Sequence, residues 1–317
     1  MCGFDPLIKA IDNYLKKADD DLSDTLKNEG YEQAEDTVKK INSIEDGLAD
    51  ILEKERNYFI QQLESKSLED ILNEYLPGII AGDYSDEAIA ELFKQEFENI
   101  MQKLADAYIK GIDKELSFST FTDRTTDWIK SWSKELGEKM KLSSHAEIEN
   151  ILSEALENGG SIQTVTDNLM ESYLFSRKRA RATAITEILT AHSASAQEAY
   201  RQSPAVEKKQ WRHTGAYKNK PRQNHVNMDG KAVDKNKPFE LVGADGKTYY
   251  PDYPRDPILP ASERVNCHCI SQPVVSGSIL GLSLAERRAL QQQAIDDDNG
   301  AWEKEIDARN KAQAGIE

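Results

Sequence analysis

The sequence has few cysteines, no long apolar run and no pattern of a secretory leader. With three cysteines in 317 residues, one of them Cys2, it lacks the disulfide framework of a small secreted protein. No run approaches the ~18 apolar residues that a membrane-spanning helix needs. The opening residues also lack the basic region and the apolar core of a signal peptide. We therefore expect no membrane partner, and either a reducing compartment or cysteines that bind a metal.

Widely used catalytic and nucleotide-binding motifs are missing as well. The sequence contains no glycine-rich phosphate-binding loop, no H-E-x-x-H and no G-x-S-x-G. It also shows no internal repeat with a period of about 20–50 residues. These absences argue against P-loop nucleotidases, zincin proteases, serine α/β-hydrolases and solenoid proteins.

Acidic residues outnumber basic ones, but unevenly along the chain. The net charge is −16 and the mean hydropathy is −0.67, which favours a soluble protein. Residues 1–200 carry 22 basic against 40 acidic side chains, whereas residues 201–275 carry 13 against 8. Within residues 177–222, eleven Lys and Arg accompany three Glu, so this block either contacts a polyanion such as DNA or forms a solvated face. The candidate DNA contacts are Arg177, Lys178, Arg179, Arg181, Lys208, Lys209, Arg212, Lys218, Lys220 and Arg222.

Apolar residues recur at three- and four-residue steps through most of residues 1–176. This spacing places them on one face of a helix, so we expect a helical body. The clearest stripe runs from Ile89 to Tyr108, in a helix that Ser85 begins, and its large side chains are expected to form core. The expected helices cover approximately residues 5–17, 31–65, 67–77, 85–108, 122–137, 144–158 and 161–174.

Proline, glycine and polar stretches mark the expected ends of these helices. The Pro-Gly pair at 77–78 and Gly137 are interpreted as helix ends. A capping box at 144–147 is expected to begin a helix that the Gly-Gly pair at 159–160 ends. The polar stretch 18–24 is expected to separate the first two helices.

Residues 177–200 predict a helix of a different kind. Seven alanines give it a face of small residues that permits close packing against another element. Its arginine-rich start is expected to lie on the outer face. Glu187 falls in the middle of this helix, where it is either an ordinary carboxylate or a catalytic one.

Residues 211–273 contrast with the helical body. They hold most of the ten prolines, both internal cysteines and three of the five histidines. We expect a strand at 208–211, a β-hairpin around the Asp-Gly pair at 245–246 and a strand over 263–275. On a strand, Cys267 and Cys269 would point to the same face.

Those two thiols allow three interpretations. With His225, and with His213 or Asp229 as a fourth ligand, they would form the kind of closed site that suits zinc. They can equally be ordinary buried cysteines, with His225 hydrogen-bonded in a turn. In the third interpretation His225 is a general base and Cys267 a nucleophile, or a bound metal activates water for nuclease or peptidase chemistry.

The order of short motifs in this region is specific. The chain reads W-x-H-T-G, K-x-x-P-R-x-x-H-V-x-M-D-G, P-F-E-L, P-R-D-P and N-C-H-C, and it resembles the phage Mu F-like minor head proteins, also called head morphogenesis proteins. The resemblance covers roughly residues 145–275 and includes an upstream helix with Arg181, Thr186, Glu187 and Ala199. The matching positions are Trp211, His213, Thr214, Gly215, Lys218, Pro221, Arg222, His225, Met228, Asp229, Gly230, Pro238, Phe239, Asp256, Pro257, Asn266, Cys267 and Cys269.

The resemblance implies a non-enzymatic minor structural protein of a tailed phage or prophage. Such proteins are present inside the procapsid near the portal and assist head assembly, and some associate with the packaged DNA. The implied partners are the portal protein, the scaffold or major capsid protein, and double-stranded DNA. The implied location is the interior of the phage head, with the host cytoplasm during assembly. A DNA-binding pilot protein that is ejected with the genome is an alternative, as is the hydrolase described above.

Taken together, the patterns predict an α+β fold. We expect a mainly helical N-terminal region over 1–140 and a Mu F-like domain over 141–275, helical to residue 205 and β-rich from residue 206. The remainder, 276–317, is expected to be a helical and partly disordered tail, which the stretch 296–300 breaks or kinks. Trp302 in this tail either anchors a partner or belongs to a solvated helix.

Overall fold

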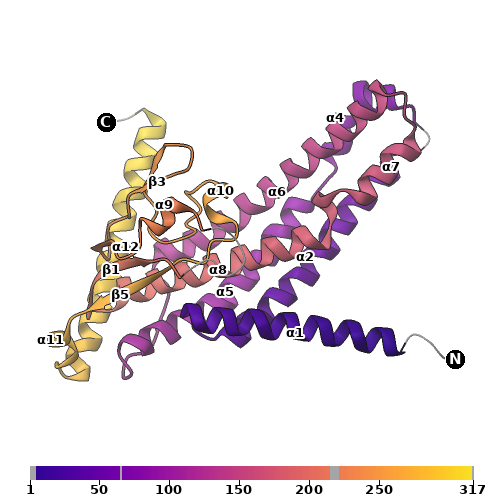
Figure 1. The fold of residues 1–317 in the computed structure, drawn as a ribbon. Coiled ribbons are helices and arrows are strands. Elements are labelled where there is room, and N and C mark those ends of the chain that lie inside the picture. The colour runs from indigo at the N-terminus through magenta and orange to yellow at the C-terminus, as the bar shows by residue number, and fades with distance from the viewer. Residues whose placement is uncertain (1–4, 65, 215–220, 316–317) are drawn as a thin grey trace. The chain divides into compact units, whose positions relative to one another are not determined.

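The computed structural model describes residues 5–64, 66–214 and 221–315 (Figure 1). The chain forms two compact units. We call Met1–Lys40, Asn99–Thr126 and Thr186–Glu317 the sheet unit, and Ile41–Glu98 with Asp127–Ile185 the helical unit. The predicted α+β class, with a mainly helical body and a small sheet near the C-terminus, is confirmed. Among the described residues, no helix has the length and the apolar character needed to cross a membrane.

Helices account for most of the chain up to residue 202. In order they are α1 (Asp5–Glu29), α2 (Ala34–Leu63), α3 (Leu68–Asp70), the π-helical η1 (Ile71–Tyr75), α4 (Leu76–Ala81), α5 (Ser85–Ile112), α6 (Asp123–Glu157), α7 (Ile162–Glu171), the short 3₁₀ turn η2 (Tyr173–Phe175) and α8 (Arg177–Gln202).

Short strands and short helices follow. They are β1 (Val206–Arg212), α9 (Gln223–Val226), β2 (Ala232–Asp234), β3 (Leu241–Val242), β4 (Thr248–Tyr249), α10 (Ala261–Arg264), β5 (Ile270–Val275), α11 (Gly277–Leu280) and the long α12 (Leu284–Ala314).

One core cluster of the helical unit joins four of its segments. Side chains from α2, α6 and α7 meet those of the short α3–α4 segment around Phe59, which is fully buried. We predicted that the Pro77-Gly78 pair ends a helix, but Pro77 lies in the first turn of α4. The π-helical η1 passes directly into α4 just before this proline, so the helical run that begins at Leu68 continues past Pro77 to Ala81.

Gly137 was also predicted to end a helix, and that prediction was wrong. Helix α6 continues through it to Glu157. A Cβ atom at position 137 would lie 2.3 Å from the carbonyl oxygen of Asp86, at the start of α5. The glycine therefore allows two helix backbones to approach closely. The predicted capping box at 144–147 likewise lies inside α6, where Ser144 bonds the Met140 carbonyl and Glu55 instead of capping a helix.

Two other predicted breaks are absent. Helix α1 runs unbroken through residues 18–24, with Ser23 and Thr25 on its buried side, and Thr25 donates its hydroxyl hydrogen to the Asp21 carbonyl. Helix α12 runs unbroken through 296–300 to Ala314. In α12 the side-chain oxygen of Asn299 accepts a hydrogen bond from a backbone amide at the start of α6, so this polar residue has a partner within the sheet unit.

The main sheet is antiparallel, with the strand order β2-β1-β5. Trp211 of β1 pairs with Ser271 of β5, and Lys209 pairs with Val233 of β2. The separate hairpin β3–β4 was predicted and is confirmed, with Gly246 in the left-handed region at φ +77. The predicted strand over 263–275 is only partly correct, because β5 begins at Ile270.

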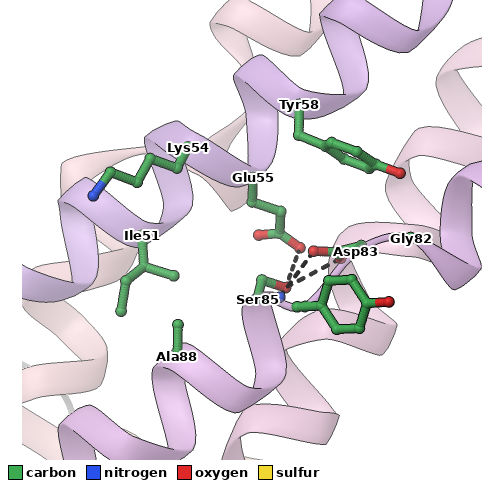
Figure 2. A pocket seen from close by; sticks show the side chains of 9 residues that line it. Ile51, Lys54, Glu55, Tyr58, Gly82, Asp83, Ser85 and Ala88 are labelled. Carbon is green, nitrogen blue, oxygen red and sulfur yellow. Dashed lines mark hydrogen bonds between the residues drawn. The ribbon is translucent and has the colours of Figure 1, made fainter.

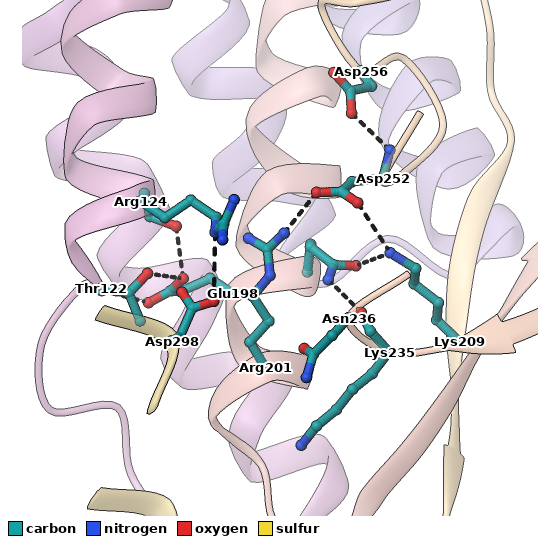
Figure 3. A network of polar contacts seen from close by, with 12 residues as sticks. Thr122, Arg124, Glu198, Arg201, Lys209, Lys235, Asn236, Asp252, Asp256 and Asp298 are labelled. Atoms are coloured by element: carbon teal, nitrogen blue, oxygen red, sulfur yellow. Dashed lines mark hydrogen bonds and ion pairs between the residues drawn. The ribbon is translucent and has the colours of Figure 1, made fainter. Parts of the chain in front are cut away.

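A polar network attaches β1 and the loop after β4 to α8 (Figure 3). Lys209 is fully buried; its ammonium lies 3.1 Å from the Gln197 side-chain oxygen and 3.6 Å from Asp252. Arg201 of α8 forms a 2.6 Å ion pair with the same aspartate. Burial lowers the pKa of Lys209 to about 8, partly offset by Asp252. Every residue of α8 from Ile188 to Gln202 is buried, so this part of the helix has no exposed face.

Two contacts connect the N-terminal part of the sheet unit to the segment before β5. The carboxylate of Glu29, at the end of α1, lies 2.7 Å from Nδ1 of His268. Tyr31 donates its hydroxyl hydrogen to the His268 carbonyl at 3.2 Å. These contacts join residues more than two hundred positions apart in the sequence.

Candidate functional site

Three buried side chains of the sheet unit converge on one point. The Nδ1 atom of His225 lies 3.5 Å from the sulfur of Cys267 and 3.7 Å from the sulfur of Cys269. All three ligand atoms lie within 4.8 Å of one another. The side chains are 2–3% exposed. The sequence predicted this group, and the structure brings it together.

Local structure, rather than a strand, aims the two cysteines. They lie in the loop between α10 and β5, after Asn266, which adopts a left-handed conformation at φ +57. His225 comes from the single turn of α9. The indole of Trp211 packs edge-on against the His225 ring, with centroids 5.7 Å apart. An apolar cluster that includes Phe239 and Leu259 encloses the group.

Glu263 fixes the orientation of His225. Its carboxylate lies 2.8 Å from Nε2 of the histidine and accepts hydrogen bonds from the Ala244 amide and the Asn224 side chain. Burial opposes ionisation of Glu263, but these hydrogen bonds outweigh it, so its pKa is lowered. With a proton on Nε2, the lone pair on Nδ1 points toward the two sulfurs.

Arg255 holds the cysteine loop from behind. It is fully buried, its backbone lies in the left-handed region at φ +69, and one guanidinium nitrogen donates to the carbonyls of both Cys267 and Cys269 at 2.7 Å. The other terminal nitrogen donates to Ser193 of α8 at 2.6 Å. The loop is therefore fixed through its backbone, which leaves both sulfurs free to face His225.

The pKa values of the two thiols are shifted in opposite directions, down for Cys267 and up for Cys269. The hydrogen bond from Cys269 lowers the pKa of Cys267 well below its usual value, and His225 and Arg255 act in the same direction against the cost of burial. The site therefore favours thiolate character on at least one sulfur. The bond to Cys267 and burial raise the pKa of Cys269, and the indole N–H of Trp211 acts in the opposite direction on the same sulfur.

His213 lies at the edge of the group. Its Nδ1 atom is 3.5 Å from the sulfur of Cys269, and its side chain is partly exposed. Its backbone amide donates to the Asp229 carboxylate at 2.8 Å. Of the two predicted fourth ligands, His213 thus reaches Cys269, whereas Asp229 accepts a hydrogen bond from the backbone amide of His213.

Several other motif residues frame this site. Thr214 donates to the His268 carbonyl, Arg222 donates to the Val265 carbonyl, and Asp256 accepts from the Asp252 amide. Gly230 has a φ of +79 and donates its amide to the Trp211 carbonyl, which shapes the predicted Asp-Gly turn. Pro221 and Pro238 are exposed, Pro257 is half-buried, and Gly215, Lys218 and Lys220 lie outside the described residues.

The basic residues of the helical unit are largely engaged with their own unit. Arg179 is buried and donates to Ser144 and to two backbone carbonyls. Arg177 and Arg181 both form ion pairs with Glu45. The arginine-rich start of α8 was expected to lie on the outer face of the helix. Instead Arg179 is buried, whereas Lys178 is exposed.

The basic residues of the sheet unit divide between its interior and its surface. Lys209 is buried in the network of Figure 3. Lys208 and Arg212 are exposed on the opposite face of β1, and Arg222 is half-buried.

Sequence reasoning missed the charged residues around the cysteines. Glu263 and Arg255 orient the group, and Arg264 forms a buried ion pair with Glu187 at 3.0 Å. Glu187 was considered as a catalytic carboxylate, but this structure assigns it a partner within the sheet unit. The available signal was the density of charged residues among the prolines of 251–264, which composition alone does not distinguish from surface charge.

A second buried cluster lies in the helical unit. Glu55, Asp83 and His145 also place their ligand atoms within 4.8 Å of one another. His145 bonds Asp83 at 2.8 Å, and Ser85 donates to both carboxylates at 3.1 Å. Glu55, Asp83 and Ser85 line a pocket of about 290 Å³, and Figure 2 shows their side chains pointing toward one another. Burial, followed by repulsion from Asp83, raises the pKa of Glu55 to about 8.

Comparison with known proteins adds to this geometry. Residues 146–272 match the model of a family described as phage Mu protein F like protein. The uncharacterized protein YqbB of Bacillus subtilis (strain 168) is 37% identical over 300 residues, which is 92% of this chain and 97% of that protein. No solved structure matches the chain.

Proposed function

We propose that this chain, which belongs to the phage Mu protein F like family, is a minor capsid protein that acts in procapsid assembly. The family match supports a head morphogenesis role, and it covers the helices and strands that build the cysteine–histidine group. The Bacillus subtilis relative extends the similarity over nearly the whole chain. The match over residues 146–272 is the observation that carries this proposal.

The family relationship also supports a finer proposal. We place the protein inside the head near the portal, with the host cytoplasm as the place of assembly. Its partners are then the portal protein and the scaffold or major capsid protein. The long helices with exposed polar faces offer surface for such contacts, but no short motif identifies which surface is used.

Catalysis by the cysteine–histidine group is less well supported. Cys267 and Cys269 are each 3% exposed, and both sulfurs already contact imidazole nitrogens. An attacking thiolate needs its electrophile within about 3–3.5 Å, and a substrate would first have to displace the packed indole of Trp211 or the loop itself. A structural role for the group is therefore favoured over nuclease or peptidase chemistry.

DNA contact is proposed as an accessory role, with fewer candidate residues than the sequence suggested. Of the described candidates, Arg179 and Lys209 are buried, and Arg177 and Arg181 are paired with Glu45. A phosphate would have to compete with these partners. Lys178, Lys208, Arg212 and the half-buried Arg222 remain as candidate contacts, too few for the strongly salt-dependent affinity of a dedicated DNA-binding protein.

The proposed function can be tested by an in-frame deletion of the gene in the phage or prophage that encodes it. We expect a fall in infectious particles, with aberrant or empty heads in electron micrographs, and recovery when the full chain is supplied from a plasmid. Mass spectrometry of purified heads should find the protein at low copy number. Normal heads in normal yield without the protein would contradict the proposal.

Cross-linking within purified procapsids addresses the partners. Cross-links to the portal protein would support the location proposed above. Cross-links confined to tail proteins would contradict it.

A further inference from the structure

We propose that His225, Cys267 and Cys269 bind one zinc ion, with His213 as the fourth ligand. The ion would fasten the loop before β5 to α9 and to the end of β1, the three segments that carry these residues. This site goes beyond the assembly role. Zinc content and head assembly are measured separately, so either proposal can fail without the other.

The distances between the ligand atoms carry the argument. In a tetrahedral site with zinc–sulfur bonds of about 2.3 Å and zinc–nitrogen bonds of about 2.05 Å, a sulfur and a nitrogen lie about 3.6 Å apart. The His225 nitrogen lies 3.5 Å from one sulfur and 3.7 Å from the other. The His213 nitrogen lies 3.5 Å from the sulfur of Cys269. Three of the four sulfur–nitrogen edges therefore already have the required length, while His213 lies outside the group of three whose ligand atoms are all within 4.8 Å of one another, so it would move closer to bind the ion.

The protonation of His225 suits a metal as well. Zinc needs a neutral imidazole with a free lone pair, and its other nitrogen normally donates to a carboxylate or carbonyl. Glu263 occupies that position at 2.8 Å from Nε2, and it is itself fixed by the Ala244 amide and the Asn224 side chain. This is the outer arrangement expected of a metal-binding histidine.

A bound zinc ion with two thiolates would leave the local charges balanced. Two thiolates and one divalent ion sum to zero, so a bound zinc adds no net charge to a buried position. Arg255 and Glu263 lie beside the group with opposite charges. A metal thus lets both cysteines ionise at once, whereas two neighbouring thiolates without it would repel each other.

The size of the surrounding core explains why a metal would be useful. The apolar cluster around the site contains seven buried residues, and two of them are the cysteines themselves. The strands β2, β3 and β4 have two or three residues each. Small regions with so little apolar burial are often fastened by a metal. With four protein ligands the site is closed, which is typical of structural rather than catalytic zinc.

The experiment is a metal analysis of the full chain purified without chelators or an affinity metal. We expect about one zinc per chain by inductively coupled plasma mass spectrometry, as for a closed four-ligand site. Cobalt added after chelation should give thiolate-to-metal charge-transfer absorption in the near ultraviolet. The spectrum reports the sulfur ligands directly and does not depend on any biological activity.

Four variants and a matched control assign the ligands. Cys267→Ser and Cys269→Ser should each lose the zinc and the cobalt charge-transfer signal, whereas Cys2→Ser should change neither. His225→Cys replaces one good zinc ligand by another, so it should retain the ion. Glu263→Gln should weaken zinc affinity by about 10–100-fold without removing a ligand. This variant remains informative if the serine variants fail to fold.

Other results would overturn the proposal. One is a folded, metal-free chain that takes up neither zinc nor cobalt while both thiols stay reduced. Another is zinc that is bound equally by the wild type and by both serine variants, which would mark the metal as adventitious. A disulfide between Cys267 and Cys269 in the freshly isolated protein would likewise contradict a zinc site.

Discussion

The sheet unit and the helical unit each contain three buried groups whose ligand atoms lie within 4.8 Å of one another. In the helical unit the contacts are hydrogen bonds of ordinary length, such as the 2.8 Å bond between His145 and Asp83. In the sheet unit the sulfur–nitrogen distances are 3.5–3.7 Å. The first set consists of oxygen and nitrogen atoms that satisfy each other with protons, whereas the second contains soft sulfur atoms at distances that fit a zinc-centred tetrahedron as well as hydrogen bonds to sulfur.

The supporting residues differ in the same way. Around Glu55, serine hydroxyls and the buried Arg179 complete a network that consists of oxygen and nitrogen atoms. Around Cys267, a glutamate orients the histidine and Arg255 holds the backbone, so both sulfurs face the histidine. Proximity alone therefore does not identify a metal site; the softness of the ligand atoms and the carboxylate behind the histidine do.

The largest effect should come from breaking the sheet-unit cluster. Cys267→Ser, or chelation of the wild type, is expected to lower the free energy of unfolding by several kcal/mol, because loss of a structural metal removes folding energy directly. Chemical denaturation with and without chelator measures this. Adding chelator to the Cys267→Ser variant should have no further effect, and a second destabilisation there would contradict the interpretation.

The cluster of the helical unit should reveal itself in the pH dependence of stability, through Glu55. Glu55 has a pKa of about 8 when folded, above its unfolded value, so the folded state binds more protons. Its contribution is complete below the unfolded pKa and is lost as the pH rises through about 8. We expect stability to fall between roughly pH 5 and 8, by a few kcal/mol at most after allowance for solvent screening.

Glu55→Gln should flatten that dependence, measured by urea unfolding across the pH range. Asp83, whose pKa is lowered, loses its contribution only as the pH falls through its folded value, and so does not interfere in this window. An unchanged slope in the Glu55→Gln variant would show that another group is responsible.

Substitutions at two helical glycines, one in each unit, should have smaller and opposite effects on stability. Gly137→Ala should destabilise by about 1–3 kcal/mol, because its Cβ would meet the Asp86 carbonyl oxygen. Gly300 also lies inside a helix, but a Cβ there meets nothing within 4 Å. Gly300→Ala should therefore stabilise by about 1 kcal/mol. Thermal unfolding of both variants tests this, and equal signs would contradict the packing argument.

The smallest effect is expected at the exposed basic residues. Lys208→Glu with Arg212→Glu should change stability by less than about 0.5 kcal/mol, since both lie on the solvent side of β1. If the protein contacts DNA through this strand, the double variant should weaken salt-dependent binding in a filter or anisotropy assay. Arg179→Ala is the contrasting variant, because it should destabilise the helical unit without a specific loss of DNA affinity.

The sequence predicted the kind of elements better than their limits. Apolar periodicity correctly indicated α5, the alanines and other strong helix formers indicated the helix over 177–200, and the Asp-Gly pair indicated the β3–β4 hairpin. Gly137 and the stretch 296–300 were interpreted as breaks because local propensity favours that. At Gly137 the deciding contact is with Asp86, some fifty residues away, so no local pattern could reveal it.

The sequence predicted which cysteine and histidine residues come together, but not the contacts that bring them together. The expectation that Cys267 and Cys269 share a strand face was incorrect, since both precede β5. They converge because Asn266 turns the chain and Arg255 binds both carbonyls. A buried arginine that bonds backbone oxygens leaves no periodic signal, so its role became visible only in three dimensions.

The contact between Glu29 and His268 has a consequence for synthesis. The two residues are 239 positions apart, and a ribosome that adds about 5–20 residues per second needs roughly 10–50 s to span them. During that interval the end of α1 and the buried Tyr31 are already outside the ribosome, while the segment that covers them has not been made. The contact can therefore form only after most of the chain has been made, and the cysteine loop completes the sheet unit only near the end of translation.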